Sequence, residues 1–249
     1  MPARSPLTPD YIKHVNVRYH DAAASEYDSK WGIDFGPTGQ QQVRGKFGKA
    51  LGEWRAEPFS DALEIGSGTG YFSLNLLQLG AIERLVATDI SPEMLSTLSA
   101  TAGRLGLTIE TKVTDAETLP FEDESFDTVV SMFTHTDVDD FATVIHETAR
   151  VLRAAGPLVY LGVHPCFVGP HAFVHDRDVP ELSPGYRDTS YRTEAPGIWS
   201  EGIRSKVGAT HLPLGLFLQT FLDAGLVLER VEEPEGRDYP HVIALRARR

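Results

Sequence analysis

The sequence is poor in cysteine and has no long apolar run. Its 249 residues include a single cysteine, Cys166, which excludes an intramolecular disulfide framework and a cysteine-rich zinc site. No stretch of about 18 consecutive apolar residues occurs, which argues against a membrane-spanning helix. The first residues, MPARSPLTPDYIK, lack the apolar stretch of a secretion signal. These absences predict a cytoplasmic protein with no membrane partner.

Basic residues are also in deficit. The chain has 23 Lys and Arg residues against 35 Asp and Glu residues, which gives a formal net charge of −12. A surface this acidic repels polyanions, so we expect no nucleic-acid partner. We expect a monomer or a homodimer, and the sequence does not distinguish between the two.

The remaining composition is that of an ordinary globular protein, with 41% hydrophobic and 23% charged residues, and the length suits one large domain or two small ones. Helical patterns near residues 11–31 and 38–56 predict an N-terminal helical cover segment over residues 1–59. From Ser60 onward short apolar runs alternate with helical patterns, which predicts βαβ units and a parallel sheet. The first five predicted strands lie at residues 62–65, 85–88, 109–113, 127–132 and 157–163.

A long segment, residues 164–210, separates the fifth predicted strand from two more at residues 226–231 and 241–245. It is rich in proline and glycine, and loops of this length are usually functional or disordered. Its aromatic residues argue against plain disorder, so we expect a substrate-covering insert. These residues are Phe167, Phe173, Tyr186, Tyr191 and Trp199.

The first predicted strand runs into a glycine loop, Glu64-Ile65-Gly66-Ser67-Gly68-Thr69-Gly70, and a helical pattern follows. Such a loop lies at the carboxyl end of a parallel sheet, where open α/β sheets bind ligands. Glycines let the backbone approach a ligand closely. Dinucleotide binding expects G-x-G-x-x-G/A, but here the bulky Tyr71 occupies the position of the third small residue. An NAD-dependent oxidoreductase is therefore a less favoured alternative.

Two carboxylates follow the next two predicted strands. Asp89 comes nineteen residues after Gly70, where a carboxylate can accept hydrogen bonds from both ribose hydroxyls. Asp115, with Ala116 beside it, follows the third predicted strand, from which a side chain could reach an adenine amino group. The glycine loop and these acids together predict a nucleoside-containing ligand.

Four motifs occur in order along residues 60–163: LEIGSGTG, VATDISPEML, DAETLPFEDESFDTVVSMF and ARVLRAAGPLVYLG. This series resembles the class I S-adenosylmethionine-dependent methyltransferases of the small-molecule type. The resemblance implies a Rossmann-like, doubly wound α/β fold, whose mostly parallel seven-stranded sheet has helices on both faces and an antiparallel last strand. It also implies a methyltransferase domain over residues 60–249, with S-adenosylmethionine as cofactor and S-adenosylhomocysteine as product.

The resemblance further implies which residues hold the cofactor. Asp89 would bind the ribose hydroxyls, with Ile90 and Met94 against the adenine. Asp115 would accept from the adenine amino group, with Ala116 beside it. The residues that would cradle the methionine part are Glu64, Gly66, Ser67 and Gly68.

Four further cofactor contacts are expected outside these motif positions. Met132 and Phe133, after the fourth strand, would flank the cofactor near its methyl group. Tyr27 matches an aromatic residue that closes over the cofactor, although core packing explains it equally well. Arg44 would pair with the cofactor carboxylate. No [DN]-P-P-[YFW] signature of amino-methylating DNA enzymes follows the fourth strand, which favours a small-molecule acceptor.

Methyl transfer needs a positioned nucleophile and, for a hydroxyl or ammonium, a group that takes its proton. His135 and His164 follow the fourth and fifth strands, and His211 precedes a predicted helix, so all three are candidate bases. A satisfied structural histidine is the alternative for each of them. No metal is expected, because prolines and a glycine interrupt the one cluster of possible ligands. That cluster comprises His164, Cys166, His171, His175 and Asp176.

The sequence therefore predicts an enzyme that transfers a methyl group from S-adenosylmethionine to oxygen, nitrogen or carbon of a small organic molecule. The main alternative is a non-catalytic protein that binds the cofactor on the same fold.

Overall fold

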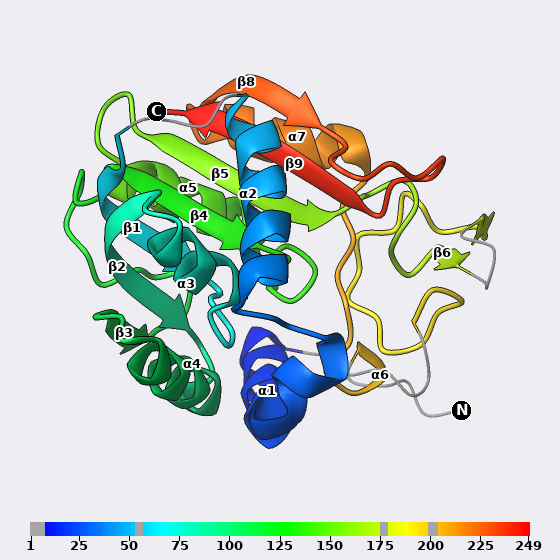
Figure 1. Ribbon diagram of the computed structural model, residues 1–249. Helices are drawn as coiled ribbons and strands as arrows, with labels where there is room; N and C mark the ends of the chain where they lie inside the picture. Colours follow the sequence, from blue (N-terminus) through cyan, green and yellow to red (C-terminus); the bar gives the residue numbers. More distant parts are fainter. Residues whose placement is uncertain (1–7, 53–56, 175–178, 199–203) are drawn as a thin grey trace.

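A seven-stranded sheet forms the centre of the computed structural model, which describes residues 8–52, 57–174, 179–198 and 204–249. The strand order is β3-β2-β1-β4-β5-β9-β8. β1 to β5 are parallel, whereas β9 lies antiparallel between β5 and β8 (Figure 1). The predicted doubly wound fold with an antiparallel last strand is confirmed. The strands are β1 (Phe59–Ile65), β2 (Ile82–Asp89), β3 (Glu110–Val113), β4 (Thr128–Met132), β5 (Pro157–Val163), β8 (Val227–Glu232) and β9 (Val242–Arg248).

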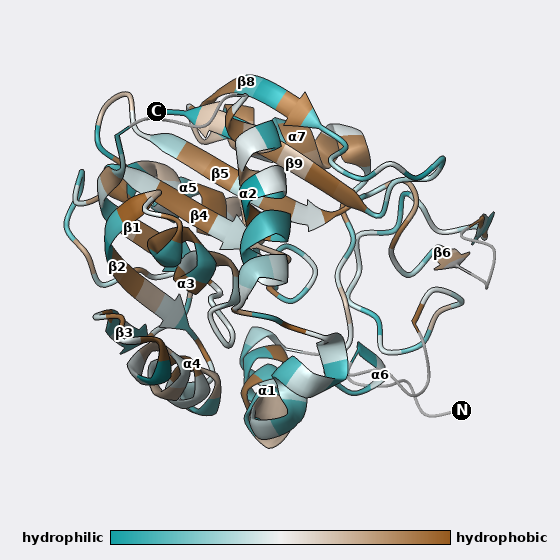
Figure 2. Ribbon diagram, in the orientation of Figure 1, coloured by the Kyte–Doolittle hydropathy of each residue, from teal (hydrophilic) through white to brown (hydrophobic). Residues whose placement is uncertain are grey.

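Helices cover both faces of this sheet. Successive strand residues point to opposite faces, so Val130 packs with the core under α2, α3 and α4, while Val129 packs with that under α5 and α7. In Figure 2 the central strands are correspondingly hydrophobic along most of their length. The helices are α1 (Pro9–Trp31), α2 (Pro37–Leu51), α3 (Tyr71–Gln78), α4 (Pro92–Leu105), α5 (Phe141–Val151), α6 (Arg204–Val207) and α7 (Leu214–Asp223).

The helix after β2 begins and ends at capping residues. Ser91 is the N-cap of α4, and its Oγ accepts the N–H of Met94 at 3.2 Å. Pro92 occupies the first turn, where its missing N–H costs nothing. Gly106 ends the helix in the left-handed conformation at φ 69°. These caps set the start and end of α4, which follows Asp89 at the end of β2.

The N-terminal helix and the described part of the predicted insert lie beyond the carboxyl ends of the parallel strands (Figure 1). α1 packs against α4 and α6. The insert contains a small antiparallel pair, β6 (Ala172–Val174) and β7 (Pro180–Leu182), and the short helix α6. At its end Thr210 donates its N–H to the carbonyl of Thr136 at 3.0 Å, which ties the insert to the loop after β4.

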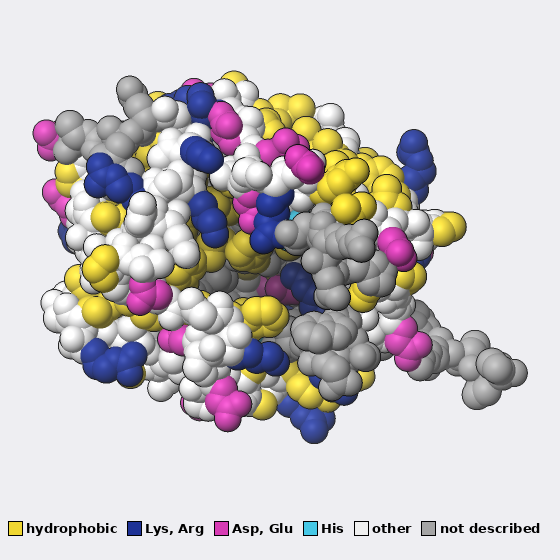
Figure 3. All heavy atoms as spheres, turned by 45° about the vertical axis from the view of Figure 1, so that its right-hand side comes forward, with side chains coloured by type: hydrophobic (Ala, Val, Ile, Leu, Met, Phe, Trp, Pro, Cys, Tyr) yellow, Lys and Arg dark blue, Asp and Glu magenta, His cyan; other side chains and the backbone are white. Residues whose placement is uncertain are grey.

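The division into a cover segment and a methyltransferase domain with an insert stays a prediction, and Trp199 lies outside the described residues. Among the helices that the structure describes, none is both long and apolar enough to cross a bilayer. On the face shown in Figure 3, Lys and Arg side chains are scattered among acidic ones around a hollowed centre.

Candidate active site

The loop between β1 and α3 holds three glycines with positive φ angles. φ is +66° at Gly66, +52° at Gly68 and +87° at Gly70, a region that other residues rarely adopt. A Cβ at Gly66 would clash with Thr134 Cγ2, whereas a Cβ at Gly68 would meet nothing within 4 Å. The loop is therefore packed against its neighbour at Gly66 and open at Gly68, where a ligand can approach the backbone.

Asp89 ends β2 beside this loop. Its Oδ2 accepts the N–H of Gly68 at 2.8 Å, and its Oδ1 accepts the N–H of Ser91 at 2.9 Å. Burial raises the pKa of Asp89, and the two N–H donors oppose that shift. A carboxylate offers about four acceptor sites, so two remain for the hydroxyl groups of a ligand.

Two buried hydroxyl groups of the glycine loop have no hydrogen-bond partner among the described residues. They are the Oγ of Ser67 and the Oγ1 of Thr69. Leaving a buried polar group unpaired costs about 1–3 kcal/mol. A polar ligand lying along the loop would remove that cost, so these orphan groups fit a site for an amino-acid moiety.

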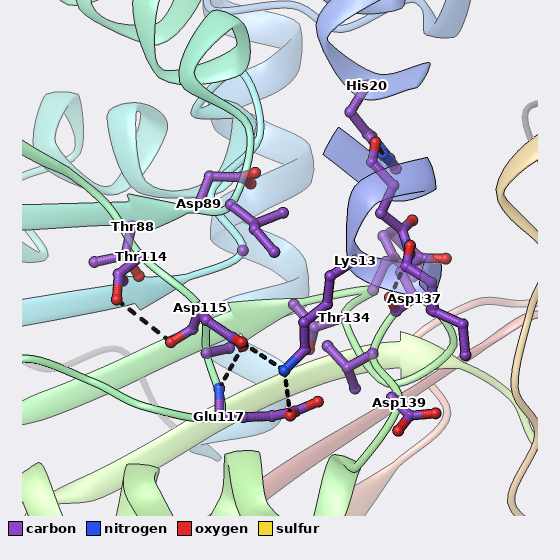
Figure 4. A pocket seen from close by; sticks show the side chains of 17 residues that line it. Lys13, His20, Thr88, Asp89, Thr114, Asp115, Glu117, Thr134, Asp137 and Asp139 are labelled. Atoms are coloured by element: carbon purple, nitrogen blue, oxygen red, sulfur yellow. Dashed lines mark hydrogen bonds and ion pairs between the residues drawn. The ribbon is translucent and has the colours of Figure 1, made fainter. Parts of the chain in front are cut away.

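A cavity adjoins the loop. Figure 4 shows its side chains, which come from α1, from the ends of the strands and from the loops after β3 and β4. The sequence-predicted residues that line it are Gly66, Asp89, Ile90, Asp115, Ala116 and Phe133. Polar lining residues that the sequence analysis did not single out are Lys13, Asn16, His20, Thr88, Thr114, Glu117, Thr134, Asp137 and Asp139.

The contribution of α1 to the cavity could have been read from spacing. Ile12, Asn16 and His20 recur every four residues and therefore lie on one face of a helix. The side chain of Asn16 donates to the carbonyl of Asp137 at 3.1 Å, which joins α1 to the loop after β4. Spacing alone does not indicate which element this face covers, because that depends on the fold of the whole domain.

Glu64 lies beneath the glycine loop and is absent from the cavity lining among the described residues. Its side chain accepts a hydrogen bond from the Oγ of Ser73 on α3, and the residue is only 2% exposed. Burial raises the pKa of Glu64 to about 8, although the bond from Ser73 opposes that shift. The Glu64 side chain is therefore bonded to α3, whereas the sequence predicts a direct role in cradling a ligand.

Two other predicted cofactor residues lie close to the cavity. Met132 is half-buried against the core. Phe133 follows it with φ +61° and lines the cavity. Strained backbone of this kind clusters at functional sites. The N–H of Phe133 donates to the carbonyl of Leu161 at 2.8 Å, which holds the turn in place.

The structure does not bring the remaining predicted cofactor residues to the cavity lining. Met94 is buried in the core. Arg44 is exposed on α2. The pKa of Tyr27 is raised to about 12, chiefly by burial and to a smaller extent by the charge of Asp137. Because the charges of Arg204 and Asp89 also act on Tyr27, this side chain is near the cavity without being in its lining. Ser67 and Gly68 are absent from the described lining as well.

His135 is a core residue. It is 2% exposed, and its ring packs against the rings of Phe141 and Phe217. Its Nδ1 lies 2.7 Å from the Oη of Tyr160. Burial lowers the pKa of His135 to about 3. Although His135 follows β4 as predicted, its side chain turns toward α5 and α7 and away from the cavity.

His164 and His211 are also buried and bonded. The Nδ1 of His164 accepts the N–H of Cys166 at 3.1 Å, so its Nε2 donates to Glu233 at 3.0 Å. The Nε2 of His211 donates to the carbonyl of Tyr186 at 2.9 Å. Burial lowers the pKa of His211 to about 4. Neither histidine lines the described cavity.

Among the described residues, no group of three or more His, Cys, Asp or Glu side chains is arranged to hold a metal ion. His175 and Asp176, which belong to the interrupted cluster of possible ligands, lie outside the described residues.

Comparison with known proteins identifies the family. Residues 63–160 match the family model described as a methyltransferase domain. A ubiquinone biosynthesis O-methyltransferase of Parvibaculum lavamentivorans is 32% identical to the chain over 179 residues, which cover 69% of this chain and 68% of that protein. The chain belongs to the S-adenosylmethionine-dependent methyltransferases. The family's cofactor is S-adenosylmethionine, for which the open glycine loop, the spare acceptor sites of Asp89 and the orphan hydroxyls are suited.

Solved structures of other methyltransferases have the same fold as this chain. An S-adenosylmethionine-dependent methyltransferase from Mesorhizobium loti aligns with a TM-score of 0.64 at 21% identity, covering 84% of this chain and 96% of its own. The 1,6-didemethyltoxoflavin-N1-methyltransferase of Burkholderia thailandensis, solved with bound 1,6-didemethyltoxoflavin and S-adenosylhomocysteine, aligns with a TM-score of 0.64 at 14% identity, and the alignment covers 100% of this chain and 93% of that one. Mycobacterial relatives are matched over only 34% of their length.

Proposed function

We propose that this protein transfers the methyl group of S-adenosylmethionine to oxygen, nitrogen or carbon of a small organic molecule. The observation that carries the proposal is the cavity that joins the glycine loop to two strand-end carboxylates, Asp89 and Asp115, under helix α1. The cavity adjoins a loop whose backbone a ligand can approach, it has carboxylates that can accept hydrogen bonds from hydroxyl and amino groups, and α1 covers it.

In this proposal, residues at the carboxyl edge of β1, β2 and β3 would hold the cofactor. Asp89 accepts from the ribose hydroxyls with its two spare sites, and Asp115 faces the adenine amino group. The hydroxyls of Ser67 and Thr69 pair with the methionine end, because they are buried and otherwise unpaired. Phe133 lies at the β4 side, where the acceptor would meet the methyl group.

The chain contributes to the reaction mainly by positioning. S-adenosylmethionine, when bound, supplies a methyl group on a good leaving sulfide, so alignment of the acceptor accounts for much of the rate. α1 and the described residues of the segment 164–210 lie beyond this edge of the sheet. For acceptors that must lose a proton, Asp137 and Asp139 are better placed than the three histidines, because both carboxylates line the cavity.

The acceptor is proposed to be a small molecule. A cavity lined by both apolar and polar side chains suits a small organic ligand, and the Parvibaculum relative is named for ubiquinone biosynthesis. A second candidate is a protein that binds the cofactor without catalysis. It is favoured by the three histidines, each of which has a ring nitrogen in hydrogen-bond contact with another group and lies away from the cavity.

A turnover assay tests the proposal. The purified protein is given S-adenosylmethionine with a panel of quinols, phenols, amines and carbon acids, and S-adenosylhomocysteine is quantified. We expect product that depends on one acceptor class and falls sharply in Asp89→Asn. Tight S-adenosylhomocysteine binding without turnover on any acceptor would favour the non-catalytic alternative. Saturable NAD binding without S-adenosylhomocysteine binding would overturn both.

A further inference from the structure

Lys13 reaches from α1 across the cavity to the loop after β3. Its Nζ lies 2.6 Å from Asp115 Oδ2 and 2.6 Å from Glu117 Oε2. Figure 4 shows the lysine between these two carboxylates. Burial alone would lower the pKa of Lys13, but hydrogen bonds and charges from Asp115 and Glu117 raise it above its ordinary value. Lys13 is therefore a cation that is paired with Asp115, the carboxylate proposed to bind the adenine amino group.

Each oxygen of the Asp115 carboxylate already has one hydrogen-bond donor. Its Oδ1 accepts the N–H of Glu117 at 2.9 Å, and its Oδ2 is paired with Lys13. An adenine amino group is a neutral donor, whereas Lys13 is a charged one, and charge-assisted hydrogen bonds are about twice as strong as neutral ones. The adenine cannot displace the lysine at Oδ2 without a cost in binding free energy.

The rest of α1 is fixed independently of this lysine. Near the middle of the helix, Asn16 donates to the carbonyl of Asp137 at 3.1 Å. Further along the helix, Asp21 accepts a hydrogen bond from the Oγ of Ser91 at 2.6 Å. Because these contacts do not involve Lys13, its long side chain can leave the cavity while the helix stays in place.

We propose that Lys13 competes with the adenine amino group for Asp115 and in this way acts as a latch at the end of the cavity that would hold the nucleobase. This competition controls both the entry of the cofactor and the discrimination between bases. This inference rests on the proposed binding of S-adenosylmethionine. The latch opens when the Lys13 side chain leaves Asp115 and the adenine amino group takes its place as the hydrogen-bond donor.

The test compares binding kinetics of S-adenosylhomocysteine to the full chain and to Lys13→Met, measured by surface plasmon resonance. The variant keeps an apolar side chain of similar length and removes the charge, so we expect an association rate about five- to tenfold higher. Raising the salt concentration should increase the association rate of the unaltered protein, because salt screens the Lys13 pairs, and leave that of the variant unchanged.

A second ligand tests discrimination between bases. S-inosylhomocysteine has an oxo group where adenine has its amino group, so it accepts a hydrogen bond at the position where adenine donates one. Lys13 can donate to that oxygen, whereas Asp115 alone would repel it. The preference for S-adenosylhomocysteine over this analogue should therefore be about fivefold larger in Lys13→Met than in the unaltered protein.

Two controls separate a latch from a general effect of charge or folding. Lys30→Met removes the same charge from an exposed position on the same helix and should behave like the unaltered protein, whereas Lys13→Arg should restore the slow association. Equal rates, equal salt dependence and equal base preference in Lys13→Met would overturn the latch and leave the proposed function standing. Failure of the unaltered protein and of Lys13→Met to bind S-adenosylhomocysteine would overturn both.

Discussion

At the scale of single residues, Asp89 carries the most specific prediction. Its carboxylate has two free acceptor sites once Gly68 and Ser91 are bonded. Asp89→Asn removes the charge and converts one oxygen into a donor, so it should lower the affinity for S-adenosylhomocysteine about 10- to 100-fold. Isothermal titration calorimetry measures the change.

The matched control is Asp123→Asn. The Asp123 side chain is 71% exposed in the loop between β3 and β4, so its replacement removes an equal charge away from the cavity and should leave affinity unchanged. If Asp89→Asn bound as tightly as the unaltered protein, the ribose contact would be wrong.

Residue positions were predictable where the backbone alone determines them. Asp89 and Asp115 follow strands that must end at the same edge of the sheet, so their presence in the cavity lining follows from sequence order. His135 also follows a strand, but the direction of its side chain depends on the aromatic residues of α5 and α7. Lys13 has no local signal in the sequence, because its importance comes from Asp115, about a hundred residues later.

At the scale of elements, the glycine loop makes a graded prediction. Gly66→Ala places a Cβ against Thr134 Cγ2, so it should lower both the free energy of unfolding and the ligand affinity. Gly68→Ala meets nothing within 4 Å, and its positive φ should cost only about 1–2 kcal/mol of stability. If a ligand lies on the open face, Gly68→Ala should still weaken S-adenosylhomocysteine binding about tenfold or more.

Gly80→Ala provides the comparison for backbone strain. Gly80 has φ +65°, meets nothing within 4 Å, and lies at the opposite end of α3. Its variant should lose stability like Gly68→Ala but keep full affinity. Urea denaturation and calorimetry report the two quantities separately, and equal binding by both variants would contradict a ligand site at Gly68.

Most elements of the domain were predictable for a physical reason. Buried parallel strands are short apolar runs, and glycine or proline marks their ends, so local composition carries the signal. The β6–β7 pair and α6 were missed because they are short and lie in a segment rich in turn residues. Their positions depend on long-range contacts such as the bond from Thr210 to Thr136.

At the scale of the whole molecule, buried histidines tie folding to pH. The pKa of His135 falls from its ordinary value of 6.5 to about 3 in the folded protein, chiefly because burial excludes water. At a pH between these two pKa values, His135 carries an extra proton in the unfolded chain but not in the folded chain. The free energy of unfolding should therefore fall as the pH is lowered from 6.5 toward 3, by at most about 1.4 kcal/mol per pH unit for this one group.

His135→Asn isolates this contribution. The amide oxygen of asparagine can accept the hydrogen bond of Tyr160 Oη but does not titrate. The variant should be less stable at neutral pH because it leaves space among Phe141 and Phe217, yet its stability should fall less steeply on acidification. The difference in slope between the two proteins is the decisive quantity, because Glu64, whose pKa is raised to about 8, acts in the opposite direction in both. Denaturant unfolding at several pH values measures these slopes. His146→Asn, at an exposed position, is the control. Parallel curves for the unaltered protein and His135→Asn would show that His135 is not a neutral core residue.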